Sequence, residues 1–432
     1  YISRVLHANG VGIYSYTFTI ATAFSLFAAL GINTYGQREI AYCQDDIKQR
    51  SQVFWELLFA RFLTTVLVCL IYIVFCFLYK EYTIYLLLQI FLITGIAFDI
   101  SWFYQGIEDF RIIAIRNIFI KLFTLILIFI IVKTPDDLWK YILINSLSTL
   151  LSYLLFFVNL DKLIIKVELK SLNFKRHIRG TIEFFIPLIA TQLYSQLDKI
   201  MLGIIKTKQD VGFYECATKL VVITLGIITS ILTIIHPRIT YIVNKKESYK
   251  QLFNKTINFV MMLSIGIMFG MFSIIKQFVP IFFGKEYINT ILLSNILCVT
   301  IPIISWSNSL RWLYFIPKEK DKIYLKSVLY GAIINLSLNL FLIVKYSSIG
   351  AAIATVISEI IVAIYQTINL KINVKKIYFN ILCYILNGII MLLILVMINN
   401  IIIKVILGII IYILLNSIYL IINKKIINKK LN

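Results

Sequence analysis

Long apolar stretches separated by short polar connections run through the whole chain. Each is about as long as the roughly 20 residues that a helix needs to cross a hydrocarbon core about 30 Å thick. The pattern predicts an all-α, polytopic membrane protein with about thirteen visible spans. These cover residues 12–31, 53–79, 83–104, 111–132, 138–160, 181–204, 214–235, 253–275, 287–316, 323–344, 348–370, 377–399 and 402–422.

The composition agrees with a membrane protein and excludes a soluble or disordered chain. Hydrophobic residues make up 60% of the sequence, charged residues only 15%, and the mean hydropathy is +0.89. A water-facing surface cannot be built from so few charged residues, and disordered segments carry far less apolar surface. The cysteines lie mostly in apolar runs and the histidines are far apart. We therefore expect no disulfide framework and no metal site.

The net charge of +21 would suggest a nucleic-acid partner in a soluble protein. Here most lysines and arginines fall in every second connection between spans, and cytoplasmic loops of membrane proteins carry such an excess. The pattern predicts a cytoplasmic C-terminus and no nucleic-acid partner. Thirteen crossings would then leave Tyr1 outside, so we expect one more helix upstream and fourteen spans in all.

An internal repeat relates the two halves of the chain. Val11-Gly12-Ile13-Tyr14 recurs as Val211-Gly212-Phe213-Tyr214, and Trp102-Phe103-Tyr104 recurs as Trp312-Leu313-Tyr314, at a separation of about 200 residues. Counting the upstream helix, each repeat has six crossings, so the two copies have the same orientation. We expect an N-lobe, a cytoplasmic connector, a C-lobe, and two extra helices with a basic tail, over residues 1–160, 161–180, 181–370 and 371–432.

Basic residues within apolar spans are the first candidates for a binding site, because a charge at membrane depth usually faces a protein-lined cavity. Lys121 is central in its span, and Arg61 lies about 12 Å from the cytoplasmic end of its span. The alternative for both is a buried salt bridge, such as Arg61 with Glu56. Three further candidates, Lys199, Lys219 and Arg311, lie nearer span ends, where lysine and arginine can also reach the headgroups. The last candidate is Arg4, which precedes the first span.

Two carboxylates are candidates for ion coupling. Glu359 is central in its span and Asp99 lies within another. A carboxylate at this depth can exchange a proton between two access states, and the alternative is a structural salt bridge.

The duplicated aromatic residues could contact sugar rings or a polyprenyl tail. Trp102, Tyr104, Trp312 and Tyr314 occupy equivalent cytoplasmic ends of equivalent spans. The alternative is a place in the aromatic belt at the membrane surface, which Trp and Tyr favour whatever the function.

Three segments resemble the O-antigen and polysaccharide flippases of the multidrug/oligosaccharidyl-lipid/polysaccharide exporter superfamily. They are YISRVLHANGVGIYSYTFTI with FAALGINTYGQREIAY at the start, QLDKIMLG at 196–203, and LNLFLIVKYSSIGAAIATVISE at 338–359. Family members usually have Gly where this chain has His7, and often Pro where it has Val344. The resemblance implies a V-shaped, two-lobed fold with a cationic central cavity that works by alternating access, and it leads us to expect no cofactor.

The same resemblance implies a function and partners. Related proteins move undecaprenyl-diphosphate-linked oligosaccharide from the cytoplasmic to the periplasmic side of the bacterial inner membrane, next to a polysaccharide polymerase and a chain-length regulator. Arg and Lys would counter the charge of the diphosphate. One alternative is a cation-coupled multidrug exporter, which should display acidic groups. Another is a membrane-embedded polymerase or ligase, which the short loops and the lack of catalytic motifs disfavour.

Overall fold

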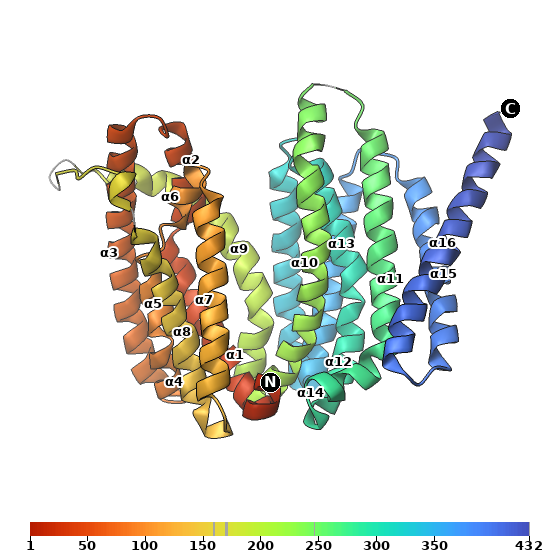
Figure 1. Ribbon diagram of the computed structural model, residues 1–432, viewed down its shortest axis with the longest axis horizontal. Helices are drawn as coiled ribbons and strands as arrows, with labels where there is room; N and C mark the ends of the chain where they lie inside the picture. The colour runs from red at the N-terminus through yellow and green to blue at the C-terminus, as the bar shows by residue number, and fades with distance from the viewer. Residues whose placement is uncertain (159, 169–171, 246, 432) are drawn as a thin grey trace. The chain divides into compact units, whose positions relative to one another are not determined.

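The computed structural model describes residues 1–158, 160–168, 172–245 and 247–431, and the regular elements in these ranges are all helices (Figure 1). Contacts divide the chain into two compact units, Tyr1–Gly212 and Phe213–Asn432. The helices of the first unit are α1 (Ile2–Ala29), α2 (Ile32–Tyr42), α3 (Ile47–Tyr79), α4 (Thr83–Leu88), α5 (Ile90–Ile96), α6 (Ser101–Gly106), α7 (Phe110–Ile131), α8 (Leu138–Leu154) and α9 (Lys175–Ile205).

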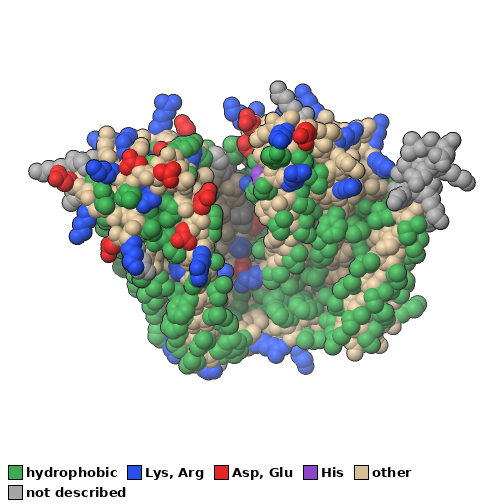
Figure 2. All heavy atoms as spheres, turned by 45° about the horizontal axis from the view of Figure 1, so that its top comes forward, with side chains coloured by type: hydrophobic (Ala, Val, Ile, Leu, Met, Phe, Trp, Pro, Cys, Tyr) green, Lys and Arg blue, Asp and Glu red, His purple; other side chains and the backbone are tan. Residues whose placement is uncertain are grey.

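The second unit contains the remaining helices, the first of which begins just before the boundary. They are α10 (Lys208–Asn244), α11 (Lys250–Phe282), α12 (Asn289–Cys298), α13 (Thr300–Leu310), a π-helical turn (Arg311–Phe315), α14 (Asp321–Ile368), α15 (Lys375–Val396) and α16 (Ile401–Leu431). In each unit charged side chains gather at the end that carries the longer polar connections, and hydrophobic side chains cover the flanks (Figure 2).

Each of the thirteen predicted spans falls mainly in helices among the described residues, and eleven stretches of these residues are long and apolar enough to cross a membrane. Two differences explain the smaller number. The predicted span 181–204 lies in α9, which is not among the eleven. The spans 323–344 and 348–370 form one helix, α14, whose 48 residues are far too long for one crossing. Ser347, with φ of 52°, interrupts α14 between these two predicted spans.

Side-chain caps mark where several spans begin. Asp46 accepts hydrogen bonds from the backbone N–H groups of Lys48 and Gln49 at the start of α3. Asp109 accepts one from Ile112 at the start of α7. Both helices follow polar connections, so the capping carboxylates satisfy orphan N–H groups at the ends of apolar runs.

Two glycines allow close backbone approaches that position neighbouring helices. Gly31, between α1 and α2, has φ of 71°, and a Cβ there would lie 2.6 Å from the carbonyl oxygen of Thr181 in α9. Gly12 of α1 lies against the backbone of Gly212 and Lys208 at the start of α10. The two copies of the repeated Val-Gly motif therefore pack on each other, and only glycine permits this approach.

His7 has an unusual backbone conformation that fits its departure from the family pattern. Its φ is 56° and its ψ is 175°, within a helix that is otherwise regular. This combination is available to glycine and costs about 1–3 kcal/mol for other residues. The glycine that the family resemblance leads us to expect here would remove that strain.

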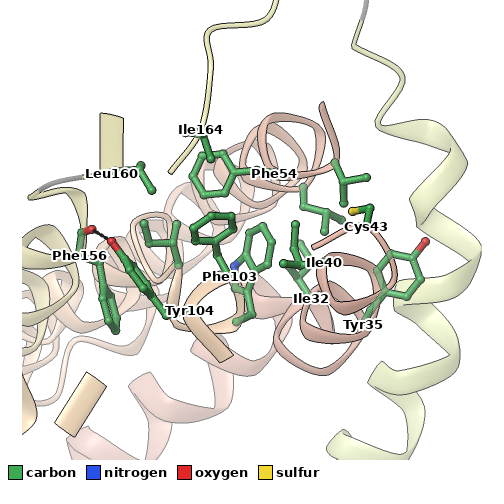
Figure 3. Close-up of a cluster of buried hydrophobic side chains, with 14 residues drawn as sticks. Ile32, Tyr35, Ile40, Cys43, Phe54, Phe103, Tyr104, Phe156, Leu160 and Ile164 are labelled. Carbon is green, nitrogen blue, oxygen red and sulfur yellow. Dashed lines mark hydrogen bonds between the residues drawn. The ribbon is translucent and has the colours of Figure 1, made fainter. Parts of the chain in front are cut away.

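A cluster of aromatic and aliphatic side chains fills the first unit near its charged end (Figure 3). Trp102, Phe103 and Tyr104 of α6 are fully buried in it, and the Tyr104 hydroxyl donates a hydrogen bond to the Phe156 carbonyl at 2.7 Å. Trp102 stacks on Phe54 of α3. Trp102 and Tyr104 are therefore core residues, and the expectation that they contact sugar rings or line the membrane surface is corrected.

Candidate functional site

The helix α7 has two chemically different faces. Arg116, Asn117, Lys121 and Thr124 recur at the spacing of one helical face and point to α8, because they line a cavity with α8 residues. The other face consists of exposed apolar side chains, which include Ile115, Ile118, Phe119, Leu122, Ile126 and Ile130. A span that crosses lipid on its apolar face must place its polar face against protein or water.

The cavity between α7 and α8 has a volume of about 350 Å³. Its polar side chains from α8 are Asn145, Ser148, Thr149 and Ser152, joined by Tyr153. Thr149 donates to the carbonyl oxygen of Asn145, and Thr124 of α7 donates to that of Ile120. Because each hydroxyl proton is used within its own helix, the lone pairs of the oxygens can accept hydrogen bonds from a guest. We refer to this cavity as the α7–α8 pocket.

Lys121 supplies a cation at the middle of the pocket. It lies about 15 Å from either end of α7, it is exposed, and it forms no hydrogen bond or ion pair with any residue that the structure describes. Lys121 is thus central in α7, as counted from the sequence, and the alternative of a buried salt bridge finds no partner among the described residues. A polar cavity next to an ammonium without an ion-pair partner among the described residues favours an anion.

Arg116 lies one and a half turns from Lys121. Its guanidinium donates to the Ser152 carbonyl at 3.1 Å and to the Asn117 side chain at 2.6 Å, and it stacks over the Phe156 ring at 3.7 Å. The Nε atom is buried without a partner among the described residues. Its contacts hold Arg116 in place while leaving part of its donor capacity unused.

Behind the pocket, Arg61 of α3 is fully buried, and each of its three guanidinium nitrogens donates a hydrogen bond. Nε donates to the Ile96 carbonyl at 2.7 Å, Nη1 to the Asn33 side chain at 2.6 Å, and Nη2 to the Asp99 carboxylate at 3.3 Å. Asp99 is itself 3% exposed. The pairing of Arg61 with Glu56 considered from the sequence is wrong, because Asp99 is the partner.

Tyr153 connects this buried pair with the pocket. It lines the α7–α8 pocket, and it interacts electrostatically with Asp99, Arg61 and Arg116. Two guanidinium groups thus share one carboxylate in this part of the first unit. The local excess of positive charge adds to the charge of Lys121.

Glu56 instead holds the end of the connector. Its buried carboxylate accepts hydrogen bonds from the Asn173 backbone at 3.0 Å, from Arg176 at 2.7 Å and from the His177 ring at 2.8 Å. Burial lowers the pKa of His177, which favours the neutral ring. In that form Nε2 donates to Glu56 and Nδ1 accepts from the Tyr35 hydroxyl at 2.9 Å.

We expect Glu56→Gln to loosen the start of α9. Removing the carboxylate leaves its partners with weaker acceptors, a loss of about 1–3 kcal/mol per charged hydrogen bond. Limited trypsin digestion should then cut the connector at Lys175 or Arg176 several-fold faster than in the wild type. The matched control is Glu39→Gln, since Glu39 pairs with Arg38 at the surface. Equal cleavage rates in both variants would refute the role of Glu56.

Arg311 is a cation in the second unit that has no ion-pair partner among the described residues. It begins the π-helical turn, a feature often found at functional sites, and its guanidinium lies over the rings of Trp312 at 5.1 Å and Tyr324 at 4.5 Å. Within the described part of the chain it makes no hydrogen bond or ion pair, and its Nε is buried. The rings fix the cation and leave its donors available.

Of the remaining predicted residues, Glu359 interacts electrostatically with Tyr324, the ring under Arg311, and none of the others lines the α7–α8 pocket. Lys219 forms an ion pair with Glu215 at 3.2 Å, Lys199 and Glu359 are half-buried in α9 and α14, and Arg4 is exposed in α1. Trp312 packs edge-on against His236. Tyr314 is fully buried and accepts a hydrogen bond from the backbone of Lys371, so it belongs to the core and not to a sugar platform.

Several residues of the site did not stand out from the sequence. Arg116 looked like a loop charge, and Asn145, Ser148 and Ser152 are unremarkable in composition. One pattern in the sequence could have indicated these residues, because polar residues recur on one face of two successive apolar spans. Among the described residues, no group of three His, Cys, Asp or Glu side chains could hold a metal ion.

Comparison with known proteins agrees with the fold and the family expected from the sequence. Two relatives are each named "Putative O-antigen transporter" and are 24% identical to this chain. The protein from Shigella dysenteriae aligns over 78% of this chain and 85% of its own length, and the protein from Escherichia coli K12 over 83% and 88%.

Two solved structures establish the fold. The lipid II flippase MurJ in an inward closed conformation superimposes with a TM-score of 0.71 over 97% of this chain and 95% of that chain, at 18% identity. An inward-facing multidrug transporter of the MATE family gives 0.61 over 84% and 92%, at 14% identity. The predicted all-helical exporter fold is confirmed. Residues 1–243, more than half of the sequence, match the family described as polysaccharide biosynthesis protein, and the chain belongs to that family.

Proposed function

We propose that this protein is a flippase that moves a lipid-linked oligosaccharide across the bacterial inner membrane. The observation that carries the proposal is the α7–α8 pocket, where an unpaired lysine at mid-span stands among hydroxyl and amide side chains. Phosphate groups bind Lys and Arg through charge-assisted hydrogen bonds, and sugar hydroxyls bind the neutral polar groups. The relatives named as O-antigen transporters support the same substrate class.

We infer that the carrier lipid is undecaprenyl diphosphate. A diphosphate at membrane depth needs counter-charges, because the desolvation of an anion costs several kcal/mol. The candidate counter-charge of the first unit is Lys121, and that of the second unit is Arg311. Arg61 acts through its neighbours: its donors are occupied, so it positions Asn33 and Asp99 and does not touch the substrate.

The proposal extends to the transport cycle and to cellular partners. Alternating access moves the headgroup between the two leaflets. Glu359 is the carboxylate proposed for ion coupling, whereas Asp99 is a structural partner of Arg61. The proposal includes a cytoplasmic C-terminus, which the excess of Lys and Arg in every second connection supports. A polysaccharide polymerase and a chain-length regulator would act on the exported units, and this chain would perform no catalysis itself.

The second candidate function is the export of cationic drugs, which the fold of the MATE family transporter permits. A site for a cation should present uncompensated carboxylates. The α7–α8 pocket has none among its lining residues, and the nearby Asp99 is paired. The charges of the pocket therefore favour an anionic headgroup.

Deletion of the gene tests the proposed function in the cell. We expect surface polysaccharide to disappear and lipid-linked repeat units to accumulate on the cytoplasmic side of the inner membrane, and both effects should be reversed by the gene on a plasmid. Unchanged polysaccharide together with increased sensitivity to cationic drugs would favour the exporter instead.

A further inference from the structure

A second polar cavity lies in the other unit, where α11, α15 and α16 meet. It has a volume of about 590 Å³, within the range of small-molecule sites. Its residues on α11 descend one face of the helix from Gln251 through Lys255 and Asn258 to Met262. Those on α15 and its approach follow the same order, from Asn373 and Lys376 to Asn380 and Tyr384. We refer to it as the α11–α15 pocket.

The lining changes from charged to apolar along the pocket. Two lysines and several amides occupy the end at which α11 and α15 begin, whereas Phe259, Met262 and Leu420 line the deeper part. The distance from Gln251 to Met262 along α11 is about 16 Å at 1.5 Å per residue. Phe259 and Leu420 are 48% and 46% exposed. This gradient matches the change from headgroups to acyl chains in a bilayer.

The charges at the polar end have no counter-ion among the residues that line the pocket. Lys255 and Lys376 form no ion pair within the part of the chain that the structure describes, and the pocket lining includes no carboxylate. The adjoining groove contains Glu247, which is accompanied by Lys250 and Lys371. Glu247 thus has lysines of its own in the adjoining groove, and the uncompensated charge of Lys255 and Lys376 favours an anion in the pocket.

A hydrogen-bond relay holds the amides of the pocket in fixed positions. Tyr419 donates to Asn380 at 2.6 Å, Asn380 donates to Asn258 at 2.7 Å, and Asn258 donates to the Asn254 carbonyl at 2.7 Å. At the end of this relay the side-chain oxygen of Asn254 is buried and has no hydrogen-bond donor among the described residues. A buried acceptor without a donor is costly, so a guest with a hydroxyl group fits here.

We propose that the α11–α15 pocket binds an anionic glycerophospholipid of the bilayer, with a headgroup that carries hydroxyls, as in phosphatidylglycerol. Lys255 and Lys376 hold the phosphate, a headgroup hydroxyl donates to Asn254, and the acyl chains run along Phe259 and Leu420. Basic pockets between transmembrane helices bind anionic headgroups in this way. The site is separate from the transport pocket, and the inference does not depend on the transported substrate.

Native mass spectrometry of the purified full chain tests the proposal. Delipidated protein is titrated with phosphatidylglycerol or phosphatidylcholine. We expect the wild type to prefer phosphatidylglycerol and the variant Lys255→Gln/Lys376→Gln to bind it about 30-fold more weakly, since each lysine near a membrane surface contributes about 1 kcal/mol. Asn254→Leu should reduce the preference for phosphatidylglycerol over phosphatidate, which lacks the headgroup hydroxyls.

The matched control is Lys250→Gln/Lys371→Gln, which removes the same charge from the adjoining groove. Wild-type affinity in the control supports the proposal. An equal loss in both double variants would show that surface charge alone attracts the lipid, and this would overturn the site. Stronger binding of undecaprenyl phosphate than of phosphatidylglycerol at Lys255 and Lys376 would also overturn it.

Discussion

Replacing Lys121 by Gln is expected to reduce export of surface polysaccharide at least tenfold while the amount of protein in the membrane stays unchanged. Lys121 has no ion-pair partner among the described residues, so its removal breaks no internal contact of that kind. A hydrogen bond between a charged donor and a phosphate is worth about 1.5–3 kcal/mol, which corresponds to roughly 10- to 150-fold in binding. The measurement is surface polysaccharide per cell, normalised to protein level.

Two further variants make this expectation specific. Lys121→Arg keeps the charge at the same depth and should retain partial export. Lys133→Gln removes a lysine just beyond the end of α7, outside the pocket, and should export normally. Wild-type export by Lys121→Gln would remove Lys121 from the substrate path.

Replacing Arg61 by Met is expected to have a different effect, a loss of folded protein. The variant leaves the Asp99 carboxylate buried without its guanidinium partner, and breaking a buried ion pair from one side typically costs 3–5 kcal/mol. Membrane levels of the protein should fall several-fold. The measurement is the amount of protein in detergent extracts together with its thermal unfolding midpoint.

The double variant Arg61→Met/Asp99→Leu isolates the cause. It removes both charges, so we expect most of the lost protein level to return. Arg38→Gln, at an exposed ion pair, is the control and should change neither level nor unfolding midpoint. A stable Arg61→Met protein that fails to export would instead favour the direct substrate contact considered from the sequence.

The spans and the family could be predicted from the sequence because both depend on local patterns. Apolar length identifies each crossing, and the position of Lys121 follows from counting residues along α7. The sequence did not predict that two spans would form one helix, α14, with a kink between them. That kink depends on the backbone conformation of a single residue, Ser347. His7 could be recognised as a departure from the family, but its positive φ required the structure.

The partners of buried charges were the main failure of prediction. Glu56 and Arg61 are five residues apart on one helix, so the sequence suggested that they pair. In the structure Glu56 reaches residues of the connector and Arg61 reaches Asp99, and both contacts join segments distant in sequence. The roles of Trp102 and Tyr104 were misjudged for the same reason, because burial depends on which helices pack around α6.

The central claim is that the protein moves an anionic lipid-linked saccharide, and reconstitution tests it most directly. Proteoliposomes containing the full chain receive a fluorescent undecaprenyl-diphosphate-linked oligosaccharide in one leaflet, and a membrane-impermeant glycosidase reports its arrival in the other. We predict that the wild type moves the saccharide lipid and that Lys121→Gln does so at least tenfold more slowly. Retention of the saccharide lipid in its original leaflet, while the same vesicles transport a cationic dye, would contradict the account.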